Sequence, residues 1–288
     1  MRTFSEIIEA VHSRARGMKL AVAASHDEET MRAVLRAKEM KIVEPVLFGN
    51  KEKIKTLANS MNLMLDVEMI NAEDSIEASR MAVESVAKGD ADILMKGMVK
   101  TSDLMSIFLR KEYKLRTERI LSAVSVHEVS TYHKLLIVSD GGMVISPNLQ
   151  QRLDIVENAV LVAHTLGIEK PRVALLGTGK EDSLTAEIAI LSKMFQRRSD
   201  CIVDGPFTLD AAISKETGFS DVLIVPHIEA GNILSKALVH FSHSRTAIVV
   251  VGGRVPIILT SRADGEETRF FSIVLGVLIA QNEVKSNV

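Results

Sequence analysis

The chain has 288 residues, of which 47% are hydrophobic and 25% are charged, and its formal net charge is −2. This length suggests about two domains, and a near-neutral charge without a polybasic run argues against nucleic acid or a membrane as a partner. The single cysteine, Cys201, excludes a disulfide framework and a thiolate metal site. Because the N-terminal residues also lack the apolar core of a signal peptide, we expect a soluble, cytoplasmic protein.

Short β-rich runs alternate with helical patterns along almost the whole sequence. Most of these runs are continuously apolar, which is typical of parallel strands that are buried on both faces. The alternation therefore predicts an α/β protein with a doubly wound, mainly parallel sheet. The expected strands cover residues 20–25, 44–49, 66–71, 91–97, 119–126, 134–140, 172–177, 201–205, 221–226, 246–253 and 256–261.

Two helical patterns stand out between these strands. Residues 149–167 carry apolar side chains at spacings of three and four, with Asn148 suited to the helix start and Gly167 to its end. The most apolar run, residues 270–280, is well short of the roughly 20 residues that span a bilayer. It therefore predicts a buried helix.

Polar residues follow three of the expected strands at the point where each strand ends. Ligands of α/β proteins gather at the carboxyl ends of strands, so these segments are candidate sites. The first segment, residues 95–103, supplies Lys96, Gly97 and Thr101, which suit an anion near the start of a helix. The ordinary alternative is an exposed lysine that binds nothing.

The second segment, HIEAGN, follows another strand and opens an amphipathic pattern. A glycine lets the backbone approach a ligand, and the amides of a helix N-terminus favour an anion. The alternative is a capped turn in which Asn232 is the helix cap. The candidate binding residues are His227, Glu229, Gly231, Asn232 and Lys236.

The third segment, TSRADGEE, places a hydroxyl, a guanidinium and a carboxylate close together at Ser261, Arg262 and Asp264. The hydroxyl of Ser261 can donate to an oxygen that gains negative charge, and Arg262 can hold a phosphate through its planar fork. The structural alternative is a capping box, in which a hydroxyl residue precedes the glutamates at 266 and 267.

Metal and covalent chemistry find no support in the sequence. The eight histidines show no HxH or HExxH spacing, so we expect no metal site. Cys201 lies in an apolar run, where a buried and inert thiol is expected in place of a nucleophile.

Several long motifs occur in a fixed order: ADILMKGMVKTSD, KLLIVSDGGMVISPNLQQRLDIVENAV, DVLIVPHIEAGNILSKALVHF and VVVGGRVPIILTSRAD. Together they resemble the phosphate acetyl/butyryl transferase family, and its butyryl branch most closely. The resemblance runs from about Asp90 to the C-terminus. It implies two α/β/α lobes arranged as in isocitrate and isopropylmalate dehydrogenases, with the active site in the cleft between them. We expect residues 1–138 and 254–288 to form the first lobe and residues 139–253 to form the second.

The resemblance also implies the reversible reaction acyl-CoA + phosphate ⇌ acyl phosphate + CoA. Coenzyme A is then a substrate, no metal or tightly bound cofactor is needed, and the chain is expected to form a homodimer or a larger homo-oligomer. A butyryl or similar short acyl group is expected to be transferred by direct attack of the CoA thiolate in a ternary complex. Ser261 and Arg262 would act on the oxyanion and the phosphate, and Asp264 would be the base, with Glu267 as the alternative.

Three positions depart from the family pattern. His227 stands where the butyryl branch commonly has Asp, and Ser235 stands where it has Tyr. Thr268 occupies the position of an Asp proposed as the base in acetyl transferases. Three alternatives therefore stay open: a phosphate acetyltransferase, a decarboxylating dehydrogenase on the same fold, and a non-catalytic protein that binds CoA or acyl phosphate.

Overall fold

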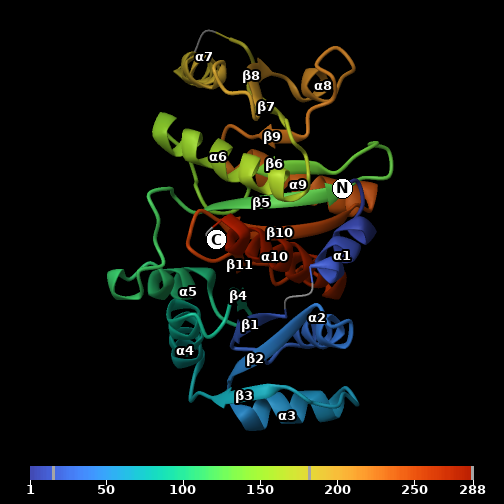
Figure 1. Cartoon of the computed structure of the whole chain (residues 1–288), viewed down its shortest axis with the longest axis vertical. Helices are drawn as coiled ribbons and strands as arrows, with labels where there is room; N and C mark the ends of the chain where they lie inside the picture. Colours follow the sequence, from blue (N-terminus) through green and yellow to red (C-terminus); the bar gives the residue numbers. More distant parts are fainter. Residues whose placement is uncertain (15–16, 181–182, 287–288) are drawn as a thin grey trace. The chain divides into compact units, whose positions relative to one another are not determined.

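The structure is a computed structural model that describes residues 1–14, 17–180 and 183–286. The chain divides into two compact units, each made of segments that are distant in sequence (Figure 1). Unit 1 comprises Met1–Glu6 and Arg119–Thr246, and unit 2 comprises Ile7–Glu118 and Ala247–Val288.

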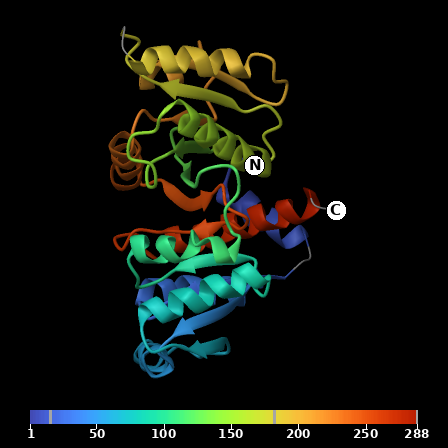
Figure 2. The same cartoon turned by 90° about the vertical axis from the view of Figure 1, so that its left-hand side faces the viewer.

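Unit 2 is built on strands in the order β3-β2-β1-β4-β11-β10. Neighbours from β3 to β11 are parallel, and β10 pairs with β11 in the antiparallel direction. Figures 1 and 2 show α4 and α5 together on one side of these strands and α2 on the other. The strands are β1 (Met18–Ala23), β2 (Val43–Gly49), β3 (Glu68–Asn71), β4 (Ile93–Lys96), β10 (Arg245–Val251) and β11 (Ile257–Ile258). The helices are α1 (Phe4–Ser13), α2 (Glu28–Glu39), α3 (Lys51–Ser60), α4 (Ser75–Lys88), α5 (Thr101–Phe108), the 3₁₀ helix η1 (Lys111–Tyr113) and α10 (Glu266–Ser286). The first residues of α1 and of β10, up to Glu6 and Thr246, belong to unit 1.

Unit 1 is built on strands in the order β5-β6-β9-β7-β8. The β5–β6 pair is antiparallel, and the other neighbours are parallel. The strands are β5 (Ser122–Glu128), β6 (Leu136–Ser139), β7 (Arg172–Leu176), β8 (Ile202–Phe207) and β9 (Val222–Ile224). The helices are α6 (Leu149–Thr165), α7 (Ser183–Phe195), α8 (Leu209–Ala212) and α9 (Ile228–Ser242).

The α/β class and the positions of the predicted strands are confirmed. Each expected run coincides with an observed strand to within a few residues, because continuous apolar runs can be buried on both faces of a sheet. The predicted limits of helix α6 are also confirmed. Asn148 and Gln151 form a capping box at its start, and Gly167, with φ +78°, follows its last turn.

The unit limits differ from those expected from the sequence, although both divisions make one unit discontinuous. The structure divides the chain after Glu118 and after Thr246, whereas the sequence-based division falls after residues 138 and 253. The antiparallel pairing of β5 with β6 explains the first difference, since it joins residues 122–128 to the strand that follows them. The sequence-based limits stay a prediction.

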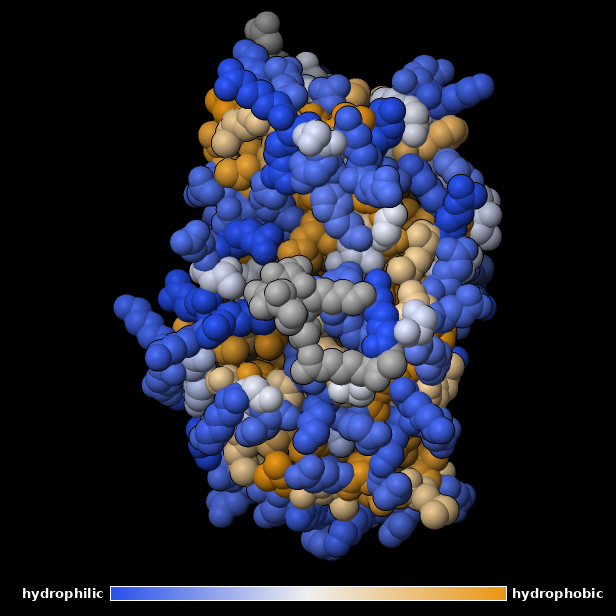
Figure 3. Space-filling view, in the orientation of Figure 1, coloured by the Kyte–Doolittle hydropathy of each residue, from blue (hydrophilic) through white to orange (hydrophobic). Residues whose placement is uncertain are grey.

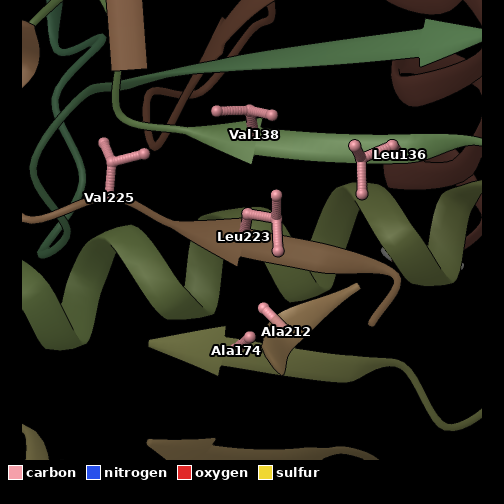
Figure 4. Packing of buried hydrophobic residues seen from close by; sticks show 6 residues of the cluster. All are labelled: Leu136, Val138, Ala174, Ala212, Leu223 and Val225. Atoms are coloured by element: carbon pink, nitrogen blue, oxygen red, sulfur yellow. The ribbon is translucent and has the colours of Figure 1, made fainter. Parts of the chain in front are cut away.

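Each unit has a buried apolar core. In unit 1, Leu136, Val138, Leu223, Val225 and Ala174 lie on β6, β9 and β7 or directly after β9, with the long helix α6 running behind the strands (Figure 4). Ala212 completes this cluster, and partly buried residues of α9 pack against it. In unit 2, the predicted apolar helix is the buried part of α10, from Phe270 to Ala280.

Hydrophilic residues cover most of the face drawn in Figure 3, and apolar residues are scattered among them. No helix within the described residues is both long and apolar enough to cross a membrane. Since scattered apolar surface residues are normal for a folded protein, this face alone indicates no particular partner.

Candidate functional site

Three neighbouring strands of unit 2 end at the same edge of the sheet. Strand β4 lies between β1 and β11 and is parallel to both, with Lys96 level with Ala23 of β1. The residues that follow these strands are Ser25–Asp27 after β1, Gly97 after β4 and Thr260–Asp264 after β11. This edge is where an α/β sheet presents a ligand site.

Lys96 is a buried cation at the centre of this edge. Its side chain is only 5% exposed, and Nζ donates to the carbonyl oxygens of Gly97 at 3.2 Å and Val99 at 3.5 Å. Burial lowers the pKa of Lys96, and the charges of Arg269 and Arg262 lower it further, while two carboxylates oppose them. The alternative of an exposed surface lysine is therefore wrong, and its role in binding an anion stays a prediction.

Gly97 is explained by close packing of backbone. A Cβ atom at this position would lie 2.4 Å from the carbonyl oxygen of Ala24, so no other residue fits without displacing the chain. The Gly97 N–H donates to Ala23 O at 2.8 Å, and the next N–H, of Met98, donates to Ala24 O at 2.8 Å. These contacts hold the β1–α2 connection against the end of β4.

Ser261, Arg262 and Asp264 form a tight turn after β11. The Asp264 carboxylate is buried and accepts the Ser261 N–H at 2.7 Å, and the Asp264 N–H donates to Ser261 O at 3.1 Å. Ser261 and Arg262 are exposed on this turn. Helix α10 begins at Glu266, five residues after Ser261, so the capping box that would start at this serine is absent and that alternative is wrong.

Arg269 of α10 clamps this turn to the start of helix α2. Its guanidinium, on a residue only 4% exposed, donates to Asp264 O at 3.0 Å and to Ser261 O at 3.4 Å. The same side chain donates to Thr30 Oγ1 at 2.6 Å and forms an ion pair with Asp27 Oδ1 at 3.3 Å. Asp27 is also the N-cap of α2, where Oδ1 accepts the Thr30 N–H at 3.0 Å. The turn is thus fixed by side chains from two distant parts of the chain.

Thr101, the remaining candidate from residues 95–103, is exposed and is the first residue of α5. Lys100 occupies the N-cap position and makes no side-chain capping bond. The backbone amides at this helix start consequently have no side-chain acceptor from their cap residue.

The candidates from HIEAGN lie at the start of α9 in unit 1. His227 is the N-cap, so the alternative in which Asn232 caps the helix is wrong. His227 Nδ1 lies 3.0 Å from Glu229 Oε2, and both side chains are more than half exposed. Asn232 is exposed and Lys236 is partly buried.

Gly231 packs against the loop that follows β6. A Cβ atom there would lie 2.8 Å from Gly141 Cα and 2.9 Å from Asp140 O. The Asp140 carboxylate shapes this loop by accepting backbone N–H groups, among them those of Gly142 at 2.8 Å and Val144 at 3.0 Å. Burial raises the pKa of Asp140, against these hydrogen bonds. Close backbone contact accounts for the glycine.

Ser235 is partly buried and belongs to a chain of polar side chains that leads to the buried His127. Its Oγ lies 3.2 Å from Ser125 Oγ, which lies 3.1 Å from His127 Nε2. His127 Nδ1 lies 3.0 Å from Thr246 Oγ1. Burial lowers the pKa of His127 to about 3, so its imidazole is neutral near pH 7.

Cys201 is buried one residue before β8, so it borders the apolar strand and does not lie within it. Burial raises the pKa of its thiol, which opposes formation of the reactive thiolate. Among the described residues, no group of three or more His, Cys, Asp or Glu side chains could hold a metal ion.

Ser25, Asp27, Thr260 and Arg269 also lie at this edge of the sheet, although no sequence pattern singled them out. The first two follow the strand β1, so the rule applied to the ends of the other strands would have found them. Arg269 carries no comparable signal, because only the folded chain brings α10 against α2.

Comparison with known proteins identifies the family of the chain. The family described as "Phosphate acetyl/butaryl transferase" matches residues 71–277. The phosphate acetyltransferase of Thermotoga maritima is 45% identical over 285 residues, which cover 93% of this chain and 97% of that protein. The phosphate butyryltransferase of Clostridium beijerinckii is 39% identical over 282 residues, which cover 91% of this chain and 93% of that protein.

Solved structures share the fold. A branched-chain phosphotransacylase from Enterococcus faecalis V583 aligns with a TM-score of 0.81 at 30% identity, over 91% of this chain and 99% of that chain. A 4-hydroxythreonine-4-phosphate dehydrogenase from Burkholderia phymatum aligns with a TM-score of 0.62 at 13% identity, over 92% of this chain and 98% of that chain, and shows likeness of fold alone. With a family match over most of its length and relatives that cover nearly all of it, the chain belongs to the phosphate acetyl/butyryl transferase family and is a phosphate acyltransferase.

Proposed function

We propose that the enzyme transfers a butyryl or similar short acyl group between coenzyme A and phosphate, by direct attack of the CoA thiolate in a ternary complex. The observation that carries the proposal is the exposed Ser261–Arg262 turn beside the buried Lys96, at the end of three adjacent strands. A hydroxyl and cations at one sheet edge suit an oxyanion and a phosphate.

In the direction of acyl-CoA synthesis, the thiolate sulfur attacks the carbonyl carbon of the acyl phosphate. Ser261 donates to the carbonyl oxygen as it becomes an oxyanion, and Arg262 holds the phosphate through its fork. The C–O bond to phosphate then breaks, its electron pair stays on the phosphate oxygen, and a thioester remains. No cysteine adduct is needed, which agrees with the burial of Cys201 and the raised pKa of its thiol.

The base that removes the thiol proton is proposed to be Asp264, with Glu267 as the alternative. Both residues lie within or directly after the turn that carries Ser261. The pH profile of kcat distinguishes them: Asp264→Asn or Glu267→Gln removes the acidic limb of the profile if that residue is the base. A limb that persists in both variants excludes both.

For the identity of the transferred acyl group, a second candidate also has specific support. The motifs favour the butyryl branch, whereas the Thermotoga maritima relative at 45% identity is a phosphate acetyltransferase. Acetyl transfer is therefore the second candidate. The proposed partners of either reaction are acyl-CoA, phosphate and a second copy of the chain, with no tightly bound cofactor.

The test is release of free CoA thiol from acetyl-, propionyl- and butyryl-CoA, with and without phosphate. We expect phosphate-dependent release that is fastest with butyryl-CoA, and net hydrolysis of acyl-CoA when arsenate replaces phosphate. The highest kcat/KM with acetyl-CoA would replace the first candidate with the second. Absence of thiol release with all acyl groups would contradict the proposal. Light scattering at micromolar concentration tests the expected homodimer.

A further inference from the structure

Several buried polar atoms at the same sheet edge lack a hydrogen-bond partner among the described residues. They are Ser25 Oγ, His26 Nδ1, Asp27 Oδ2 and Thr260 Oγ1. Ser25 is only 1% exposed and Thr260 only 2% exposed. Unsatisfied buried groups are rare in folded proteins because each one is costly, so a concentration of them points to a missing partner.

These atoms flank Lys96 on its two sides. On one side, Ala23 of β1 pairs with Lys96, and Ser25 follows two residues later. On the other side, Ile258 of β11 pairs with Met95, and Thr260 follows two residues later. Strand β4 is the middle strand of the three, so the two hydroxyl residues follow the strands on either side of the lysine. Adjacent strands are about 4.8 Å apart, so the strands that Ser25 and Thr260 follow are about two such spacings apart, with Lys96 between them.

The charges around Lys96 favour an anion. Its ammonium contacts two carbonyl oxygens and ion-pairs with no carboxylate in the described part of the chain. The charged side chains that act on it are Arg269 and Arg262, which are cations, and Asp27 and Asp264, which are carboxylates. Counting Lys96, three cations and two carboxylates act here; the third cation, Arg262, is exposed, so the net positive charge attracts an anion but is not a buried excess.

One oxygen in the cluster, Asp27 Oδ2, can only accept a hydrogen bond when the carboxylate is ionised. Asp27 Oδ1 faces Arg269 and the Thr30 N–H, whereas Asp27 Oδ2 is buried without a donor. Inorganic phosphate near neutral pH carries a hydroxyl that can donate to such an oxygen. Sulfate carries none, so its oxygens would meet the carboxylate without a hydrogen bond.

We propose that Ser25, Thr260, Lys96 and Asp27 form the subsite for the phosphate that is acylated, with the two hydroxyls and the ammonium as donors and Asp27 Oδ2 as the acceptor for the phosphate hydroxyl. This inference rests on the proposed function, and it assigns Lys96 to the reacting phosphate and not to the phosphates of CoA. It also makes the subsite selective for phosphate over sulfate.

The variants Ser25→Ala and Thr260→Val test the donors. A hydrogen bond to a charged group is strong enough that each variant should raise KM for phosphate about tenfold, with KM for acyl-CoA nearly unchanged. The matched control is Ser79→Ala, since Ser79 is a fully buried serine of the same unit whose Oγ already donates to Ser75 O at 2.7 Å. It should leave both KM values unchanged.

A binding measurement separates this role from a structural one. Because Ser25→Ala removes an unpartnered polar atom, we expect the melting temperature without ligand to stay the same or rise, while stabilisation by added inorganic phosphate is lost. A lower melting temperature with unchanged stabilisation by phosphate would assign the hydroxyl to the fold and overturn the proposal.

Asp27→Asn tests selectivity. Inhibition by sulfate, relative to KM for phosphate, should strengthen about tenfold, because the acceptor for the phosphate hydroxyl and the charge that repels sulfate are both lost. If this variant does not fold, Ser25→Ala and Thr260→Val still decide the proposal.

The outcomes distinguish this inference from the proposed function. Wild-type turnover with unchanged phosphate KM in Ser25→Ala and Thr260→Val would refute the subsite and leave the acyl transfer intact. A rise confined to KM for acyl-CoA would place the CoA phosphates at Lys96 and refute the assignment. Phosphate stabilisation that depends on Ser25, without acyl transfer by the wild type, would support the subsite and contradict the proposed reaction.

Discussion

Replacing Arg269 with Met should destabilise the protein far more than the same change at an exposed arginine. The variant loses the hydrogen bonds to the carbonyls of Asp264 and Ser261 and leaves the carboxylate of Asp27, which is only 16% exposed, without its cation. Removing one partner of a buried ion pair typically costs about 3–5 kcal/mol of unfolding free energy. At roughly 2–4 °C per kcal/mol, the melting temperature should fall on the order of 10 °C.

Arg32→Met is the matched control. Arg32 pairs with Glu28 at 2.7 Å on the same helix, α2, but its side chain is 40% exposed and that of Glu28 is 55% exposed. An exposed pair of this kind contributes about 0–1 kcal/mol. Thermal or denaturant unfolding of the two variants under identical conditions gives the comparison. Equal destabilisation would refute the clamp.

Arg269→Lys separates positioning from stability. The lysine keeps a charge for Asp27 but cannot form the planar fork that reaches two carbonyl oxygens and Thr30. Because those carbonyls belong to the turn that carries Ser261, we expect kcat to fall while both KM values change little, at a temperature where the variant is folded. A purely structural role predicts normal kcat in the folded fraction.

Four further substitutions test the site and the fold. Ser261→Ala should lower kcat by about 10²–10³ with little change in KM or melting temperature, since it is not a helix cap; normal turnover would exclude an oxyanion role. Arg262→Lys should raise KM for phosphate more than KM for acyl-CoA, and the reverse order would move Arg262 to the CoA site. Cys201→Ala should keep most activity, and loss of turnover in the folded variant would indicate a covalent mechanism. The pKa of His127 in the folded protein lies far below its value in the unfolded chain, so the unfolded chain binds a proton first as pH falls. The unfolding free energy should therefore decrease by about 2 kcal/mol between roughly pH 7 and pH 5. In chemical denaturation, His127→Gln should remove this component and the exposed His240→Gln should not.

The sequence predicted the strands well because the signal is local. A short run rich in β-branched apolar residues, such as residues 246–253, is typical of a strand buried on both faces, and β10 occupies nearly the same positions. Helix α6 was equally readable, since its apolar spacing of three and four, Asn148 at its start and Gly167 after its end are all local features of the sequence. Pairing direction was not readable, and the antiparallel β5–β6 pair moved the limit of unit 1 away from the expected position.

The glycines show why a residue type alone does not define a site. Gly97 and Gly231 were selected because glycine permits a ligand to approach the backbone. In the structure both are required by other backbone: Gly97 by Ala24 O, and Gly231 by Gly141 and the preceding carbonyl. The sequence specifies that something approaches closely at each position, but not whether it is a ligand or the chain itself.

Asp27 and Ser261 differ in whether a helix cap accounts for the side chain. Ser261 invited a helix-cap interpretation and is not a cap, because α10 begins five residues later. Asp27 is a cap, and this ordinary role accounts only for Oδ1, which accepts the Thr30 N–H and faces Arg269. Its Oδ2 is buried with no donor in the described residues, so the cap does not exhaust the side chain. At this position, one side chain can therefore both cap a helix and bind a ligand. The criterion that separates the two roles is whether every buried polar atom of the side chain has a partner within the chain.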